Sequence, residues 1–154
     1  MLDAMQRTKL HAVALIGALI LGIFGCATQP SFTAGPTDAD APADFTQTES
    51  GLKYRILRKS DGVKPTASDT VTVHYAGWLD DQTEFDSSYR RGKPATFALN
   101  QVVAGWTEGL QFVSEGGMIE LEIPPFLGYG PQGSPGSIPP NATLHFKVEL
   151  IDIH

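Results

Sequence analysis

The 154-residue sequence holds a single cysteine, Cys26, so no disulfide can form within the chain. Basic residues are also few: 11 Lys and Arg stand against 17 Asp and Glu, which gives a formal net charge of −6. An acidic chain without a basic stripe argues against nucleic acid and against electrostatic binding to anionic lipid. The histidines, which are His11, His74, His145 and His154, lack the spacing of metal ligands. We therefore expect no nucleic-acid partner and no metal site.

Two motifs of calcium binding and of hydrolysis are also missing. An EF-hand loop counted from Asp80 has Phe85 where glycine is needed and Arg91 where glutamate is needed. Ser134 lies near glycines, but Gln132 breaks the pattern of a nucleophile elbow. The sequence thus predicts neither a calcium site nor a catalytic serine, and we expect no cofactor.

The apolar run from Ala12 to Phe24 is too short to span a membrane comfortably as a helix. Arg7 and Lys9 precede it, so residues 1–25 are expected to be an export signal. The run ends in IFGC at Cys26, which resembles the lipobox of bacterial lipoproteins. This resemblance implies that Cys26 is acylated and anchors the chain to a membrane. The alternative is a plain secretory signal with an incidental cysteine.

Residues 26–49 lack the apolar side chains of a core. Thr, Pro, Ala, Gly and Asp dominate, which predicts a disordered tether behind the lipidated cysteine. No helical repeat long enough for a coiled-coil arm occurs there, so we expect a monomer. Alternating apolar residues begin near Gly51, which places the folded domain at residues 50–154.

Most of this domain has the period-two pattern of β-strands. Val71, Val73 and Tyr75 share one face of the segment 70–79. The same alternation predicts further inward-facing sets: Leu52, Tyr54 and Ile56; Ile119, Leu121 and Ile123; and Leu144, Phe146, Val148 and Leu150. Residues 126–140 are rich in Gly and Pro and indicate a long ordered loop. Short antiparallel strands around one helix predict an α+β domain.

The expected helix runs from Gln101 to Val113. Val103, Trp106, Leu110 and Val113 recur three or four positions apart and form one apolar stripe. Trp106 is the largest side chain on this helix. It either fills the core or forms the floor of a pocket.

Inward aromatic side chains come from six separate segments, more than a domain of this size needs. They are Tyr75, Phe85, Phe97, Trp106, Tyr129 and Phe146. The pattern alone fits a purely structural core as well as it fits a pocket. Asp86 favours the pocket, because a carboxylate directly after the inward Phe85 is costly unless it is hydrogen-bonded or functional.

Five ordered blocks carry a resemblance: VHYAGWL (73–79), EFDSS (84–88), VVAGWTEGL (102–110), GYGPQGSPGSIPPNATL (128–144) and FKVEL (146–150). Together they resemble the FK506-binding-protein (FKBP) class of peptidyl-prolyl cis-trans isomerases, in particular its bacterial, envelope-associated branch. The resemblance covers residues 50–154. It implies a five-stranded antiparallel sheet wrapped around one short helix, with the substrate pocket between them.

Carried onto this sequence, the family's site has two groups of residues. The catalytic group is Asp86, Tyr129, Phe146, Trp106 and Tyr75. The substrate-binding group is Phe85, Val102, Val103, Ile138 and Phe97. By this resemblance Trp106 would lie under the proline ring, and Asp86 would order the polar rim. The Val103 N–H and the Tyr129 hydroxyl would bond substrate carbonyls.

The resemblance predicts isomerisation of Xaa-Pro bonds in exported polypeptides. A chaperone-like module that holds Pro-containing segments is the main alternative, and a structural tether with a vestigial pocket is another. Macrolides such as FK506 are candidate ligands, but Ala95 and Ser134 replace an aromatic residue and a histidine of many eukaryotic members, which opens the rim. Gln82 stands at a turn position that is commonly Gly, so it either adopts a positive φ or uses another turn. Ala27 after Cys26, where Asp would suggest inner-membrane retention in some bacteria, favours an outer-membrane anchor facing the periplasm.

Overall fold

The computed structural model describes residues 34–154, so the predicted signal peptide and Cys26 lie outside the described residues. The strands are β1 Thr46–Gln47, β2 Lys53–Arg58, β3 Thr70–Trp78, β4 Glu84–Ser87, β5 Ala95–Ala98, β6 Met118–Ile123 and β7 Leu144–Ile153. The helix α1 spans Ala104–Gly109, and the short 3₁₀ turns are Leu99–Gln101, Leu110–Phe112, Pro125–Leu127 and Gly130–Gln132. Within residues 34–154, no helix has the length and apolar character needed to cross a membrane.

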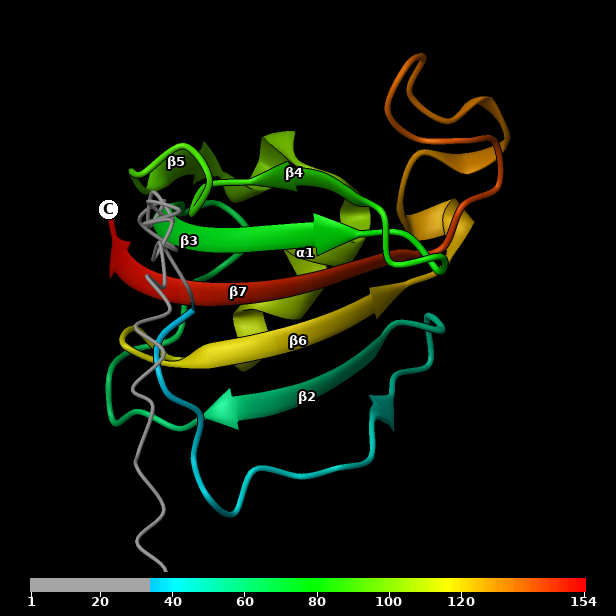
Figure 1. Ribbon diagram of the computed structural model, residues 1–154. Helices are drawn as coiled ribbons and strands as arrows, with labels where there is room; N and C mark the ends of the chain where they lie inside the picture. Colours follow the sequence, from blue (N-terminus) through cyan, green and yellow to red (C-terminus); the bar gives the residue numbers. More distant parts are fainter. Residues whose placement is uncertain (1–33) are drawn as a thin grey trace, which may run out of the picture.

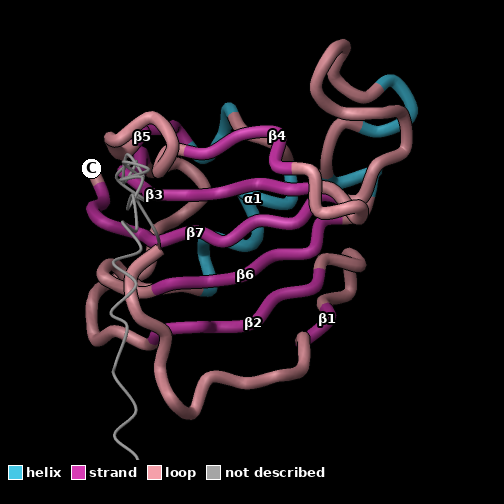
Figure 2. Tube along the Cα trace, in the orientation of Figure 1, coloured by secondary structure: helices cyan, strands magenta, loops and turns pink. Residues whose placement is uncertain are grey.

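The strands form one antiparallel sheet in the order β1-β2-β6-β7-β3-β4, and β5 also pairs with β3 (Figure 1). Helix α1 packs against one face of this sheet (Figure 2). Within residues 34–154 the α+β class with a single short α-helix is therefore confirmed, whereas the sheet there has seven strands and not the expected five. The difference arises because the two-residue β1 is added at one edge and because β4 and β5 both pair with β3.

Burial along the strands follows the predicted alternation. Val71, Val73 and Tyr75 of β3 are buried, and the residues between them are only partly covered. Strand β2 agrees with the prediction: Tyr54 and Ile56 are half-buried and pack against the core, next to the buried Leu52. Leu57, at the alternate position, is also buried but is not part of the core cluster. The register of β2 against β6 shifts between Ile56 and Arg58, so Leu57 lies at an irregularity of the ladder.

The helix is shorter than the predicted 101–113. Only Ala104–Gly109 is α-helical, because Val103 before it is extended and the residues after it tighten into a 3₁₀ turn. A helix of this length is not stable alone in water, so packing against the sheet must hold it. Gly109 allows that close packing: an added Cβ there would lie 2.6 Å from Leu121 Cδ2. Trp106 faces the core from this helix as predicted.

The described part of the expected tether is ordered. The Gly35 N–H donates to the Glu149 carboxylate at 2.7 Å, and the Asp38 N–H donates to the Leu57 carbonyl at 2.8 Å. Further on, the segment supplies strand β1 at the sheet edge. The prediction of disorder is therefore wrong for residues 34–49. The segment is held by backbone hydrogen bonds, which an apolar-poor composition does not reveal.

The turn at Gln82 resolves the alternative left by the sequence. Gln82 adopts a φ of 68°, in the left-handed region that favours glycine. Its N–H donates to the Leu79 carbonyl at 2.9 Å, which closes the turn between β3 and β4. The turn thus keeps the conformation that glycine would take, at a small cost in backbone energy.

Candidate functional site

A cavity of about 590 Å³ opens between the sheet and α1. Its lining residues are Tyr75, Phe85, Asp86, Phe97, Gln101, Val102, Val103, Trp106, Tyr129, Ser134, Ser137, Ile138 and Phe146. Every residue that the family resemblance placed in the catalytic and substrate-binding groups lies around this one cavity. Ser134, which the resemblance placed at the rim, also lines it, together with Gln101 and Ser137, for which no role was predicted.

Trp106 forms the floor of the cavity. Its side chain is only 4% exposed, and three aromatic rings meet it nearly edge-to-face. The ring centroids of Tyr75, Phe97 and Phe146 lie 5.2, 5.5 and 5.2 Å from that of Trp106. Edge-to-face pairs are a favourable arrangement of aromatic rings, so the walls support one another. The result is a compact apolar box that the side chains themselves keep in shape.

A glycine makes room for one wall of this box. Gly77 on β3 pairs with Phe146 on β7 and with Asp86 on β4. The rings of Phe85 and Phe146 meet above it, with centroids 5.4 Å apart. A Cβ on Gly77 would lie 2.6 Å from Phe146 Cε1 and 2.7 Å from Phe85 Cζ. No residue other than glycine fits there without moving the rings.

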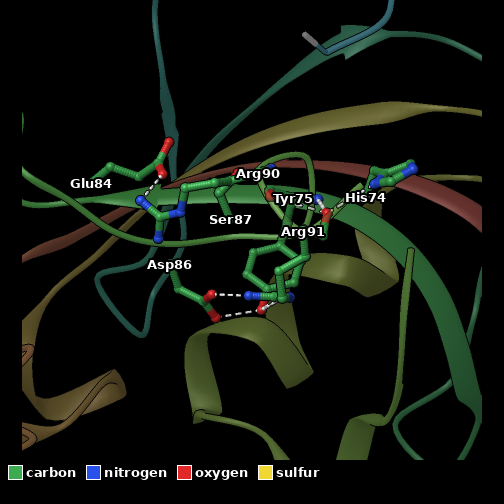
Figure 3. A network of polar contacts seen from close by, with 8 residues as sticks. His74, Tyr75, Glu84, Asp86, Ser87, Arg90 and Arg91 are labelled. Atoms are coloured by element: carbon green, nitrogen blue, oxygen red, sulfur yellow. Dashed lines mark hydrogen bonds and ion pairs between the residues drawn. The ribbon is translucent and has the colours of Figure 1, made fainter. Parts of the chain in front are cut away.

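The polar rim is a closed triangle of three side chains (Figure 3). The Tyr75 hydroxyl donates to Asp86 Oδ2, and the Arg91 guanidinium donates through Nη1 to Asp86 Oδ1. Arg91 also donates through Nη2 to the Tyr75 hydroxyl oxygen at 2.8 Å. Each of the three groups thus holds the other two, and both carboxylate oxygens of Asp86 have a partner.

The triangle fixes the protonation states of its members. Burial disfavours the ionised form of Asp86 and is the largest single influence, but the hydrogen bonds from Tyr75 and Arg91 together outweigh it and lower the pKa of Asp86. Burial, followed by the hydrogen bond to Asp86, raises the pKa of Tyr75 to about 12. At neutral pH the rim therefore holds a carboxylate, a guanidinium and a neutral phenol.

Arg91 is the site residue that sequence reasoning missed. It lies in the loop between β4 and β5, where the sequence suggests a basic side chain that is simply exposed to solvent. A signal was present: Asp86 needed a partner, and two arginines follow it within five positions. Sequence alone did not show which one serves, since Arg90 pairs with Glu84 at 2.8 Å instead.

The far wall of the cavity comes from the long loop after β6, which projects from the body of the domain (Figure 1). Ile138 is buried there and is held by two hydrogen bonds of 2.8 Å between its backbone and that of Ser134. Tyr129 on the same loop also lines the cavity and is 45% exposed, so it adds a phenol to a part of the lining that is open to solvent. The loop thus adds one apolar and one polar contact to the site.

The lining suits binding better than bond cleavage. The described residues around the cavity include no histidine, cysteine or lysine that could activate Ser134 or Ser137. Among the described residues, the backbone N–H of Val103 donates to no backbone carbonyl, whereas the Val103 carbonyl accepts from Trp106 and Thr107 at the start of α1. A mostly apolar cavity with a few polar groups at its edge has the usual make-up of a small-ligand site.

Comparison with known proteins identifies the family of this chain. The family model described as FKBP-type peptidyl-prolyl cis-trans isomerase matches residues 62–151. The chain belongs to this family. It is 51% identical over 111 residues to a probable FKBP-type peptidyl-prolyl cis-trans isomerase of Haemophilus influenzae, covering 72% of this chain and 46% of that protein. It is 51% identical over 104 residues to outer membrane protein MIP of Legionella longbeachae, covering 68% of this chain and 45% of that one.

Solved structures of FKBP-type proteins share the fold. The crystal structure of FkpA from Escherichia coli matches with a TM-score of 0.70 and 48% identity, over 73% of this chain and 52% of that one. The crystal structure of AtFKBP13 matches with a TM-score of 0.66 and 34% identity, over 72% of this chain and 99% of that one. The chain spans less than half the length of the curated relatives that it matches, as the Haemophilus influenzae and Legionella longbeachae proteins illustrate.

Proposed function

We propose that this FKBP-family chain is a peptidyl-prolyl cis-trans isomerase that acts on Xaa-Pro bonds of exported polypeptides. The observation that carries the proposal is the aromatic cavity: Trp106 closes its floor, and the triangle of Asp86, Tyr75 and Arg91 borders its mouth. Proline is a compact apolar ring, and an aromatic box of this kind offers it flat faces. The name of the family, which the chain shares over residues 62–151, supports the same reaction.

The reaction needs no nucleophile, which agrees with the largely apolar and aromatic character of the described lining. Rotation about the Xaa-Pro bond is slow because resonance gives the C–N bond partial double-bond character, with a barrier of about 18–20 kcal/mol. In the transition state the amide is twisted and less polar, so a dry apolar cavity favours it over the planar form that water stabilises. Each 1.4 kcal/mol or so of this preference accelerates the exchange about tenfold.

Two polar groups at the edge would hold the substrate while the bond turns. In our proposal the Val103 N–H and the Tyr129 hydroxyl bind substrate carbonyls, and both groups border the cavity. A carbonyl fixed on one side of the proline ring lets the other side rotate. Asp86 would keep the rim ordered, because its two bonded neighbours, Tyr75 and Arg91, cannot turn independently of it.

The proposal is tested by isomerisation of an Xaa-Pro tetrapeptide, measured for the wild type, Asp86→Leu and Phe146→Ala. We expect catalysis by the wild type and a loss of at least about tenfold in each variant, because one breaks the rim and the other removes a wall. Phe126→Ala is the matched control: it deletes the same side chain from a position that is 71% exposed and outside the cavity, and it should leave activity unchanged. If the wild type isomerises the peptide no faster than the uncatalysed reaction, the hypothesis that the chain is an enzyme is falsified.

The competing hypothesis is a chaperone-like module that binds Pro-containing segments, with isomerisation as an incidental activity. Suppression of aggregation of a denatured client protein separates the two. If Asp86→Leu is folded and inactive but suppresses aggregation as well as the wild type, holding is a separate activity of the chain. If suppression falls together with isomerisation, one site serves both.

We also propose that the chain is a bacterial envelope protein anchored through lipid on Cys26 and facing the periplasm from the outer membrane. The lipobox-like sequence that ends at Cys26 supports this, and one relative is named an outer membrane protein. The experiment is fractionation of cells that express the full chain with Cys26→Ser. Release of the protein from the membrane fraction is the expected result, and undiminished membrane association would show that the lipid anchor is wrong.

A further inference from the structure

The turn that carries Arg91 is anchored on the face of the sheet opposite the cavity. This turn, residues 88–92, follows β4, and Arg90 to Gly92 within it are exposed. The bonds to Asp86 and Tyr75 hold the Arg91 guanidinium, but the backbone of Arg91 lies in an exposed turn. Of the two buried residues at the start of this turn, Ser88 bonds to the backbone of Tyr75, and Tyr89 reaches across to Glu149 on β7.

Tyr89 closes the turn around Arg91. The Gly92 N–H donates to the Tyr89 carbonyl at 2.9 Å, so Arg91 is the third residue of a four-residue turn. Gly92 has a φ of 71°, which glycine adopts without strain and which lets the chain reverse directly after Arg91. The backbone of Arg91 is therefore fixed relative to Tyr89, two residues before it.

Tyr89 is itself held tightly, and by groups that do not border the cavity. Its side chain is 7% exposed, and its ring stacks on His74 with centroids 4.8 Å apart. Its hydroxyl donates to Glu149 on β7. Glu149 also accepts from the Gly35 N–H at 2.7 Å and from Arg58 at 2.9 Å, so it is fixed by three donors from separate parts of the chain.

We infer that Tyr89 is a positioning residue for the isomerase site: its bond to Glu149 fixes the turn that directs Arg91 at Asp86 and Tyr75. The inference rests on the proposed function, because it takes the triangle at the rim to serve isomerisation. Tyr89 does not line the cavity and touches no substrate. Its influence on the reaction passes through Arg91.

The test compares Tyr89→Phe, Arg91→Ala and the double variant in the full chain. Tyr89→Phe keeps the ring on His74 and removes only the hydroxyl, and Glu149 retains its other two donors. We expect kcat/KM for an Xaa-Pro peptide to fall about fivefold in Tyr89→Phe, the effect of one hydrogen bond. Arg91→Ala should lose at least as much, and the double variant should be no worse than Arg91→Ala alone.

Tyr54→Phe is the matched control. It also removes a phenol hydroxyl, from a ring that stacks on Phe112 at 4.4 Å and lies outside the cavity lining. Its kcat/KM should equal that of the wild type. A Tyr89→Phe variant with wild-type activity would overturn the inference. So would a further fivefold loss when Tyr89→Phe is added to Arg91→Ala, because Tyr89 would then act by a route that bypasses Arg91.

A second measurement is independent of activity and separates this inference from the proposed function. The Arg91 Nε–H resonance in a ¹H–¹⁵N spectrum is expected to be sharp in the wild type, where the guanidinium is held, and broadened in Tyr89→Phe. If the wild type does not catalyse isomerisation but the signal broadens, the proposed function fails and the positioning of Arg91 by Tyr89 stands. If the signal is unchanged by Tyr89→Phe, the positioning is refuted whatever the activity.

Discussion

Gly77 offers the sharpest single-site test of how the cavity is built. Gly77→Ala adds one methyl group beneath the rings of Phe85 and Phe146. The new Cβ would lie 2.6 Å from Phe146 Cε1, whereas ordinary contact begins at 3.4 Å, so the overlap is 3.4 − 2.6 = 0.8 Å. The same subtraction for Phe85 Cζ gives 3.4 − 2.7 = 0.7 Å. Two rings must move by most of an ångström for one methyl group.

The rings are not free to move away from the methyl group without consequence. Phe146 packs against Trp106 with ring centroids 5.2 Å apart, and both rings of the clash, Phe85 and Phe146, line the cavity, so moving them changes its shape. Overpacking of this kind costs about 1–3 kcal/mol of stability. We expect an additional loss of at least about tenfold in kcat/KM, because a displaced wall no longer fits the twisted amide.

The measurements are urea unfolding, for stability, and isomerisation of an Xaa-Pro tetrapeptide by the folded variant. Gly109→Ala is the matched control: its Cβ would meet Leu121 Cδ2 at a similar 2.6 Å, and neither residue lines the cavity. It should be destabilised to a comparable degree and keep its activity. Full activity in a folded Gly77→Ala variant would refute the reasoning, since the rings would then have yielded without narrowing the cavity.

Three further outcomes are expected. Burial opposes ionisation of Glu149, but hydrogen bonds from Tyr89, Gly35 and Arg58 outweigh it and lower the pKa of Glu149. The stability that the Glu149 carboxylate contributes is therefore complete above the ordinary pKa of 4.5 and is lost as pH falls through the lowered pKa. Thermal melts should show this loss of stability at low pH, and the loss should be smaller in Glu149→Gln. The pKa of Tyr75, raised by burial to about 12 from 10.0, gives stability that is present below pH 10.0 and lost as pH rises to about 12, which ultraviolet titration and melting should both report. Trp106→Ala should lower the free energy of unfolding by about 3–5 kcal/mol in urea titrations and remove peptide binding, because it empties the cavity floor.

Local pattern predicted the parts of the fold in which one face of an element is buried. The alternation of Val71, Val73 and Tyr75 gave β3 and its inward face correctly, because a strand of period two can bury only one set. The spacing of Trp106, Leu110 and Val113 gave the buried stripe, although the regular helix ends at Gly109. Helix length depends on how far the sheet supports it, and periodicity does not contain that information.

Contacts between distant polar groups were the part that the pattern did not predict. The segment containing Gly35 and Asp38 has the composition of a tether, yet it is held by backbone hydrogen bonds to groups far along the chain. Arg91 is a second example, because its role depends on the bonds of its guanidinium to Asp86 and Tyr75, which the residue pattern does not reveal. The placing of the aromatic residues around one cavity came from the family resemblance, since the residue pattern fitted a plain core equally well.

The indole at the cavity floor also gives the protein an optical property. The chain has two tryptophans, Trp106 at the cavity floor and the partly exposed Trp78, whose ring stacks on His145 at 6.0 Å. Trp78→Phe would leave Trp106 as the sole source of indole fluorescence. A proline ring that displaces water from that floor should shift the emission to shorter wavelength and change its intensity. Occupancy can then be titrated without any label, including in variants that bind a peptide but no longer rotate its bond.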